Sequence, residues 1–140
     1  MIAMTTTTMT TTIRVESAGG RAYRIATRDH EVLVDQPVEA GGEGRGPQPI
    51  ELFVGSLAAC VATYAGSFLR RNAIDADDLR VDCEYELADD RPARVGAIRI
   101  RIAVPDGLPE DRRAPLLAMA RHCTAHNTLR QPPPVDITLA

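Results

Sequence analysis

Three cysteines are the residues of this 140-residue chain whose types and spacing could do chemistry. Cys60 lies among Leu and Ala, where a cysteine is ordinarily a small apolar core residue. Cys123 lies in the segment RHCTAHNTL, where it could pack in the core, act as a resolving thiol, or bind a metal in a ligand set with His126 and Cys60. Zinc is disfavoured because it needs three or four ligands and this Cys-x-x-His motif has no matching second pair. Cys83 alternates with charged residues along a predicted strand, which indicates packing.

The composition excludes several classes of partner. A formal net charge of -3 leaves nothing that would attract nucleic acid or an anionic membrane. Residues 1–12 are rich in Thr and lack the charged and apolar regions of a secretory signal, so they are predicted to be a disordered tail. No unbroken apolar run approaches the roughly 20 residues that span a bilayer. We therefore expect a cytoplasmic protein with reduced thiols and a single domain over residues 13–140.

The element that must position Cys60 is a long helix predicted for residues 49–71. Pro49 suits the first turn of a helix, because the N–H that proline lacks would be unpaired there in any case. From Ile50 to Phe68, apolar residues recur with the i, i+3, i+4, i+7 spacing of one helix face. The opposite face of the first half is also apolar or small, which predicts a helix covered on several sides.

The other elements that the sequence predicts belong to an α+β fold. Alternating apolar residues indicate antiparallel strands, clusters of Pro and Gly indicate loops, and a second apolar periodicity indicates a helix that carries Cys123. The predicted ranges are three short strands in 13–38, a loop in 36–48, a hairpin of 79–87 and 98–104, a helix in 109–125 and a final strand in 135–139.

Together these segments resemble the OsmC/Ohr family of osmotically inducible and organic hydroperoxide resistance proteins. The resemblance extends from about Ile13 to Leu139 in the order of elements. The motifs that carry it are Gly41-Gly42, Gly46-Pro47, Pro49, Glu51-Leu52, Ala58-Ala59-Cys60, and Cys123 with His126-Asn127-Thr128-Leu129. The resemblance implies antiparallel sheets packed on a long central helix, and an intertwined homodimer with each active site at the dimer interface.

The resemblance also implies a thiol peroxidase that needs neither a metal nor an organic cofactor. Cys60 would be the thiolate that attacks an organic hydroperoxide and becomes a sulfenic acid. Cys123 would then condense with Cys60 to a disulfide, which an external dithiol reduces. A sulfenic acid beside a second thiol is trapped reversibly in this way before further oxidation.

A buried thiolate in the middle of a helix needs a nearby cation, because burial disfavours the charged form. The peroxidases of the family use an Arg held by a Glu. Arg21, in a Gly-Gly-Arg turn, resembles the Arg-bearing segment of the family, with Arg45 and Arg28 as alternatives. Asp35 resembles a family position at the end of the third strand, although Asp before a Pro-containing turn is also ordinary turn chemistry.

The glutamate is where this sequence departs from the family pattern. In the family peroxidases it lies ten residues before the cysteine, and here that position is Ile50. Glu51 is nine residues before Cys60, on the opposite side of the helix, where an acid in the first turn also suits the helix dipole. Two hypotheses remain open: an organic hydroperoxide reductase that uses Cys60, Cys123, Arg21 and Glu51, or a non-catalytic OsmC-like protein that binds an apolar ligand or senses oxidants slowly.

Overall fold

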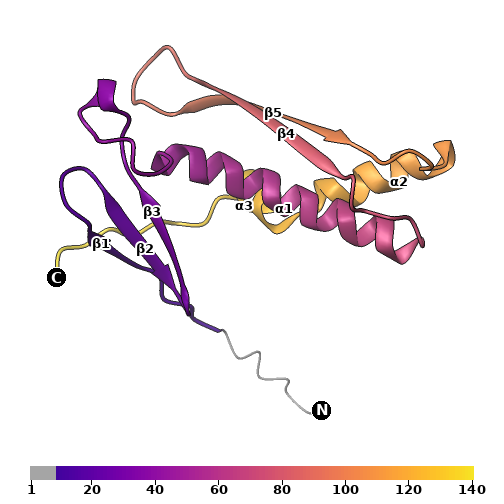
Figure 1. The fold of residues 1–140 in the computed structure, drawn as a ribbon, viewed down its shortest axis with the longest axis horizontal. Helices are drawn as coiled ribbons and strands as arrows, with labels where there is room; N and C mark the ends of the chain where they lie inside the picture. Colours follow the sequence, from indigo (N-terminus) through magenta and orange to yellow (C-terminus); the bar gives the residue numbers. More distant parts are fainter. Residues whose placement is uncertain (1–8) are drawn as a thin grey trace. The chain divides into compact units, whose positions relative to one another are not determined.

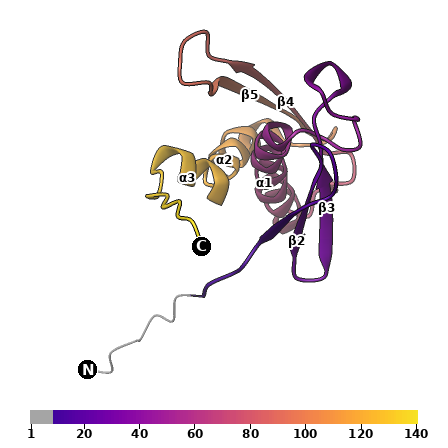
Figure 2. The same cartoon turned by 90° about the vertical axis from the view of Figure 1, so that its left-hand side faces the viewer.

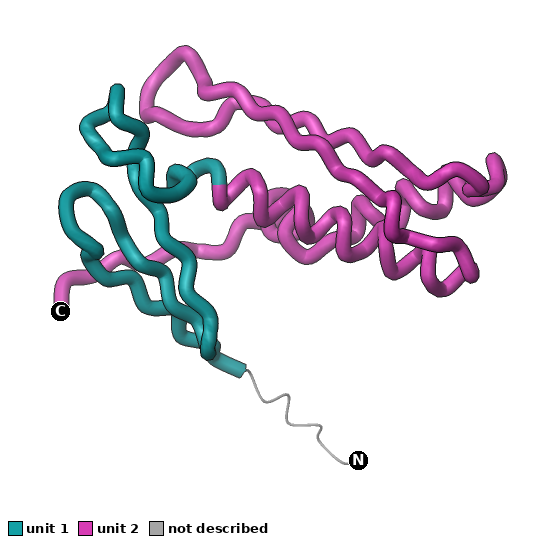
Figure 3. The backbone as a smooth tube through the Cα atoms, viewed as in Figure 1, with its two compact units in different colours: residues 1–51 teal, residues 52–140 magenta. Residues whose placement is uncertain are grey.

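Residues 9–140 are described by a computed structural model, and most of the tail predicted for residues 1–12 lies outside them (Figure 1). The chain divides into two compact units, residues 1–51 and residues 52–140 (Figure 3). The single domain expected over residues 13–140 stays a prediction. Both units contain antiparallel strands, and the second also contains helices, so the fold is α+β as the sequence predicts.

The first unit is built on the predicted three-stranded antiparallel sheet. Its strands are β1 (Arg14–Ser17), β2 (Tyr23–Thr27) and β3 (His30–Val34), in the order β1-β2-β3. Gly19 and Gly20, both with positive φ (93° and 58°), form the turn between β1 and β2. Backbone of that conformation favours glycine, which explains the Gly-Gly pair that the sequence marked as a turn.

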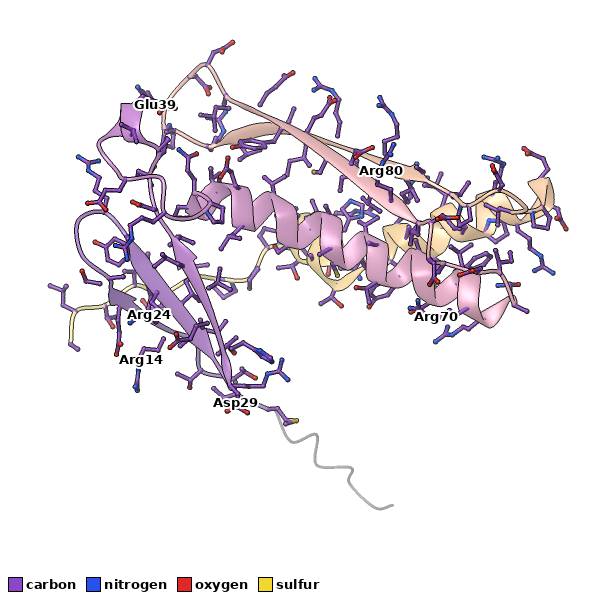
Figure 4. All side chains as sticks on the ribbon, viewed as in Figure 1. Arg14, Arg24, Asp29, Glu39, Arg70 and Arg80 are labelled. Atoms are coloured by element: carbon purple, nitrogen blue, oxygen red, sulfur yellow. The ribbon has the colours of Figure 1, made fainter. Side chains whose placement is uncertain are left out.

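The two faces of this sheet differ sharply in polarity. The register pairs Val15 with Ile25 and Ile25 with Val32, so one face is apolar. The other face carries Arg14 and Arg24 (both labelled in Figure 4), and Arg24 Nε lies 3.5 Å from Glu31 Oε2. Several apolar side chains of the sheet region are exposed: Ile13 (60%), Val15 (56%), Tyr23 (47%) and Val32 (43%). The apolar face of this sheet is therefore partly exposed among residues 9–140.

The long helix α1 (Pro49–Arg71) begins and ends at the predicted residues. The Gln48 N–H donates to Glu51 Oε2 at 2.8 Å, which satisfies one of the N–H groups that a helix start leaves unpaired. Arg70 (labelled in Figure 4) and Arg71 lie in the last turn, where positive charge suits the helix dipole.

Burial on α1 is narrower than the sequence predicts. The buried positions form one stripe: Val54, Leu57, Val61, Ala65, Gly66 and Leu69. Phe53 is 47% exposed, and Gly55, Ser56 and Ala59 are exposed as well, so residues 9–140 do not cover α1 on several sides. The small and apolar face that suggested wider coverage is only partly buried by the described part of the chain.

By length and composition alone, α1 is able to cross a membrane, although it contains no unbroken apolar run of that length. It has 23 residues and a mean hydropathy of 1.7 over its most apolar window. A third of that window is buried, and its buried stripe belongs to the core of the second unit. The core helix of a soluble protein passes the same test, so no membrane protein is implied.

The second unit packs the predicted hairpin against α1. Its strands are β4 (Arg80–Leu87) and β5 (Val95–Ala103), and the hairpin runs along α1 (Figure 1). Val81, Ile98, Ile100 and Ile102 form the inner face and pack on the buried core. The outer face is charged, with Arg99 Nη1 donating to Glu86 Oε1 at 2.9 Å. This bond, together with the charge of Arg99, lowers the pKa of Glu86.

The second predicted helix is two helices, α2 (Glu110–Arg121) and α3 (Thr124–Arg130). In Figure 2, α1 and α2 lie side by side. Cys123 interrupts the helical path with an extended backbone (φ -63°, ψ 145°), so the single helix expected over residues 109–125 was wrong at its end. The apolar periodicity ran through this break because Leu116, Ala120 and Cys123 face the same core.

The final strand predicted for residues 135–139 is absent. After α3 the chain has no regular structure, and its alternating apolar side chains are exposed: Val135 (79%), Ile137 (89%) and Leu139 (101%). The alternation of apolar residues predicts a strand, but strand formation also requires a neighbour to pair with. Within residues 9–140 this segment has no such neighbour.

Candidate active site

The second unit brings together the two cysteines that the sequence analysis singled out. Cys123 is completely buried in a core cluster with Leu57, Val61 and Ala120, and Cys60 is half-buried against the same cluster. Both are free thiols. Their side chains are close enough for a hydrogen bond between Cys60 and Cys123 to affect the pKa of Cys123. Residues 63 positions apart in sequence thus form one dithiol site, with Cys60 as its more accessible member.

Cys123 also has a structural role as the residue that starts α3. Its Sγ accepts a hydrogen bond from the His126 N–H at 3.3 Å, which is the contact of an N-cap residue. Sulfur is a weak acceptor compared with the oxygen of Ser, Thr or Asp, the usual residues at this position. The start of α3 is therefore held by a group that could also take part in redox chemistry.

Burial raises the pKa of Cys123, because the thiolate is less well solvated in the core than in water. The hydrogen bond with Cys60 and the charge of Cys60 raise it further, while the N–H groups of His126 and Ala125 act in the opposite direction. Burial is the largest of these causes, so the pKa of Cys123 is raised overall.

A hydrogen bond connects the two helices beside the dithiol. The Tyr64 hydroxyl lies 3.1 Å from Thr124 Oγ1, joining α1 to the first residue of α3. Tyr64 follows Cys60 by one helical turn, and Thr124 follows Cys123 directly. Sequence reasoning missed both residues, because neither a tyrosine on an apolar helix face nor a threonine after a cysteine is a signal by itself.

His126, three residues after Cys123, has a hydrogen-bond partner close in the sequence. His126 Nδ1 lies 3.0 Å from the Arg121 carbonyl oxygen, so the ring bonds across the break between α2 and α3. If Nδ1 carries the proton and donates, Nε2 is the acceptor of the neutral ring. Among the described residues 9–140, no three His, Cys, Asp or Glu side chains gather in a way that could hold a metal.

In the first unit, Asp35 organises the loop that follows β3. Its side chain is buried, and its carboxylate accepts backbone N–H groups from Gln36 (2.7 Å), Arg45 (3.1 Å) and Glu43 (3.3 Å). The hydrogen bond from Arg45 is the largest cause of a lowered pKa at Asp35, against the opposing effect of burial. Asp35 therefore does more than begin a turn, because its hydrogen bonds fold back ten residues of loop.

Two positions of this loop require glycine because a side chain there would collide with the backbone. A Cβ on Gly42 would lie 2.0 Å from the Gln36 carbonyl oxygen, and one on Gly46 would lie 2.3 Å from the Leu33 carbonyl oxygen. Both neighbours are backbone and cannot rotate away. The spacing Gly42-x-x-x-Gly46, one of the motifs behind the family resemblance, is thus required for the loop to pack against the end of β3.

The three candidate arginines occupy different parts of the first unit. The exposed Arg21 guanidinium lies against Gly41, 3.3 Å from where a Cβ would be. Arg45 Nη1 donates to the Ala18 carbonyl oxygen at 3.0 Å and so ties the loop to the β1–β2 turn. Arg28, with φ 52°, lies in the β2–β3 turn, at the opposite end of β2 from Arg21. Arg21 and Arg45 therefore share one end of the unit.

The structure thus brings two of the four predicted site residues together. Cys60 and Cys123 meet in the second unit, whereas Arg21 and Glu51 belong to the first, and their participation in the site stays a prediction. Glu51 has a separate role through its bond to the Gln48 N–H. Cys83 is half-buried on the hairpin and pairs with Ile100, and burial, followed by the charge of Glu84, raises its pKa.

Comparison with known proteins gives one matching family model, described as OsmC-like protein, over residues 42–138. The match covers the end of the loop that follows Asp35, from Gly42 onward, together with Cys60, Cys123 and the C-terminal segment as far as residue 138. No curated protein matches the sequence.

Solved structures of this type resemble the chain over nearly its whole length. A protein of Psychrobacter arcticus, described as an osmotic stress induced and detoxification response protein, is 25% identical with a TM-score of 0.77, and the match covers 86% of this chain and 89% of that protein. An organic hydroperoxide resistance protein OsmC of Legionella pneumophila is also 25% identical, with a TM-score of 0.65 and coverage of 87% and 90%. An OsmC-like protein of Mycoplasma pneumoniae shares the fold at 16% identity, with a TM-score of 0.74 and coverage of 87% and 88%.

Proposed function

This chain belongs to the OsmC-like protein family, and on that premise we propose that it is a cytoplasmic thiol-dependent peroxidase that reduces organic hydroperoxides. The observation that carries the proposal is the dithiol of the second unit. Cys60 is the more accessible thiol, and Cys123 is fully buried beside it with a raised pKa. A nucleophilic thiol and a protonated resolving thiol in contact are what reversible peroxide reduction requires. The name of the Legionella pneumophila relative points to the same substrate class.

The proposed reaction has three steps. The Cys60 thiolate attacks one peroxide oxygen, the O–O bond breaks, and the alcohol leaves with a proton while Cys60 becomes a sulfenic acid. Cys123 sulfur then bonds to Cys60 sulfur, and the sulfenic hydroxyl leaves as water with the Cys123 proton. An external dithiol reduces the disulfide by thiol–disulfide exchange and restores both thiols. None of the three proposed steps uses a metal or an organic cofactor.

In this proposal Arg21 supplies the positive charge that favours the Cys60 thiolate, and Glu51 holds Arg21. Arg21 is exposed, and none of the ion pairs found among residues 9–140 uses it. Arg45 is the weaker candidate because its guanidinium already donates to the Ala18 carbonyl. Replacing Arg21 with Lys keeps a charge without the planar fork, so Arg21→Lys should be slower than wild type and Arg21→Ala slower still.

The proposed enzyme is a homodimer, and exposed apolar side chains support this. Val15 and Val32 of the first unit and Phe53 of α1 are 43% to 56% exposed. The C-terminal segment 132–140 exposes alternating apolar residues and has no strand partner in the part of the chain that the structure describes. A second copy would bury such surfaces. Sedimentation equilibrium should give twice the chain mass, and a monomer at micromolar concentration would refute the dimer.

The decisive experiment follows free thiols in reduced protein after one equivalent of cumene hydroperoxide or of hydrogen peroxide. The proposal predicts loss of two thiols within seconds, faster with the organic peroxide. The loss should vanish in Cys60→Ser and persist in Cys83→Ser, the matched control that removes the third cysteine. A slow loss that does not distinguish the oxidants, or one that survives in Cys60→Ser, would overturn the proposal.

A second candidate function is a non-catalytic OsmC-like protein that binds an apolar ligand or is oxidised slowly. The observations that favour it are Ile50 in the place of the family glutamate and the use of Glu51 as a partner for the Gln48 N–H. The hollow at the end of α3, lined by Asn127, Arg130 and Gln131, is polar and does not suit an apolar ligand. The thiol experiment decides between the two functions, because slow oxidation is the result that this candidate predicts.

A further inference from the structure

A contact outside the dithiol joins the two elements that carry the thiols. The Tyr64 hydroxyl and Thr124 Oγ1 are 3.1 Å apart, and residues 64 and 124 come from α1 and α3. The Tyr64 ring packs against the buried core of the second unit, so its position is fixed while its hydroxyl reaches Thr124. A side chain with a fixed ring and a polar end suits the placement of another element.

The position of this contact relates it to the thiols. Tyr64 lies one turn after Cys60 on the same helix face, and Thr124 is the residue after Cys123. The start of α3 is also held by the His126 ring on the Arg121 carbonyl, at 3.0 Å, and by the bond from the His126 N–H to Cys123 Sγ, at 3.3 Å. That bond uses the sulfur which the proposed reaction consumes. The Tyr64–Thr124 bond does not, so it can hold α3 in place while Cys123 changes its bonding.

We propose that Tyr64 is a positioning residue which, through Thr124, places Cys123 opposite Cys60 for disulfide formation. The inference rests on the proposed function for the identity of the oxidised species, the Cys60 sulfenic acid. In disulfide formation, Cys123 Sγ bonds to Cys60 Sγ and the S–O bond of the Cys60 sulfenic acid breaks. The hydroxyl leaves as water with the proton of Cys123. Tyr64 forms no bond to the reacting atoms.

Such a role affects the second oxidation step and not the first. The sulfenic acid either meets Cys123 or meets another peroxide and becomes a sulfinic acid, which is not reversed by thiols. Better placement of Cys123 favours the disulfide. Loss of the Tyr64 hydroxyl should therefore slow disulfide formation and increase over-oxidation, while the attack of Cys60 on the peroxide keeps its rate.

Tyr64→Phe tests this, because it keeps the ring in the core and removes the bond to Thr124. Stopped-flow mixing with cumene hydroperoxide should show an unchanged first phase and a disulfide phase slower by about threefold to tenfold, the size of one net hydrogen bond. Mass spectrometry at excess peroxide should show more sulfinic acid at Cys60. Matched controls are Thr63→Val and Thr128→Val, whose hydroxyls bond to backbone carbonyls of their own helices.

The partner residue provides the second arm of the test. Thr124→Val should reproduce the effect of Tyr64→Phe, and Thr124→Ser, which retains the hydroxyl, should restore the wild-type rate. Because the two side chains act through one bond, the double variant Tyr64→Phe/Thr124→Val should be no slower than either single variant. Additive effects, or a slow Thr124→Ser, would show that packing and not the hydrogen bond is responsible, and would overturn the inference.

Failure of this inference can be separated from failure of the proposed function by an oxidant that is not a peroxide. Oxidised dithiothreitol converts the dithiol to the disulfide by exchange, without a sulfenic acid. If wild type ignores hydroperoxides but Tyr64→Phe closes the disulfide more slowly with oxidised dithiothreitol, the proposed function falls and the positioning role stands. If wild type reduces hydroperoxides and Tyr64→Phe closes at the wild-type rate with both oxidants, the positioning role falls.

Discussion

In two segments of this chain, one side chain accepts hydrogen bonds from backbone N–H groups. The accepting group is a carboxylate in one segment and a thiol in the other. The loop after β3 is organised by the Asp35 carboxylate, which accepts three backbone N–H groups. The start of α3 is organised by the Cys123 thiol, which accepts one N–H at 3.3 Å. Bonds to a charged oxygen are roughly twice as strong as neutral ones, and sulfur is weaker again. The loop is therefore held by strong bonds to one charged group, while the side-chain cap of α3 is a weak contact.

The difference matches the chemistry that the two regions are proposed to perform. Asp35 is ionised at neutral pH and has no reaction to undergo, so a network of strong bonds around it fixes Gly42 and Gly46 against backbone carbonyls. Cys123 must give up its proton and form a bond to Cys60 in the proposed cycle. A strong network around Cys123 would oppose that change, and the Tyr64–Thr124 bond supports α3 from a neighbouring position instead.

The largest loss of stability is expected from Gly42→Ala, in the loop around Asp35. The new Cβ would meet the Gln36 carbonyl oxygen, so the loop must move and the bonds to Asp35 must lengthen. Overpacking of this kind costs about 1 to 3 kcal/mol, and contact with rigid backbone favours the upper end. Urea unfolding followed by circular dichroism should show the loss. Gly55→Ala is the matched control, because nothing lies within 4 Å of its Cβ and alanine favours the helix. Equal stability of the two variants would mean that the loop is not held tightly.

The pH dependence of stability provides the next test. The Asp35 pKa is lowered from 3.8 in the folded protein, so its contribution to stability is complete above about pH 4 and is lost as the pH falls through the folded pKa. Cys123 has a raised pKa, so its contribution is present below about pH 9 and is lost at more alkaline pH. Asp35→Asn lacks this contribution, so its unfolding free energy should fall less between pH 5 and pH 2 than that of wild type. An unchanged acid profile would argue against the Asp35 network.

A smaller effect is expected at the start of α3. Cys123→Ala removes the cap and a buried sulfur, which should cost about 1 to 2 kcal/mol of unfolding free energy. Cys123→Ser puts a stronger acceptor in the same place, so it should unfold at a higher urea concentration than Cys123→Ala. Neither variant forms the disulfide, which separates the structural role of Cys123 from its proposed redox role. Equal urea midpoints for the two variants would show that the Cys123 cap contributes nothing.

The sequence was sufficient where the signal was local. The bounds of α1 follow from Pro49 and an unbroken apolar periodicity, and the β4–β5 hairpin follows from strict alternation. The dithiol was found through a family resemblance, since two cysteines 63 residues apart carry no information about their distance. Composition and spacing alone left Cys60 as a core residue.

The sequence failed where the outcome depends on a partner distant along the chain. The break at Cys123 is set by the contact of the thiol with the His126 N–H, which the apolar periodicity does not register. The strand expected at residues 135–139 has the correct alternation but no neighbour within the described chain. Asp35 resembled an ordinary turn residue, because its bonds to residues 43 and 45 form only once the loop has closed.

The smallest effect is expected at Glu51, which is intermediate between Asp35 and Cys123. Glu51 is a carboxylate, like Asp35, but it accepts a single N–H, like Cys123. Glu51→Gln keeps an acceptor for the Gln48 N–H, so stability should change by less than about 0.5 kcal/mol. If Glu51 also holds Arg21, as proposed, loss of its charge should slow hydroperoxide consumption by at most about fivefold, the size of an exposed ion pair. An unchanged rate in Glu51→Gln, with a measurable loss of stability in Glu51→Ala, would show that Glu51 acts as a helix cap and that Arg21 is held by another group.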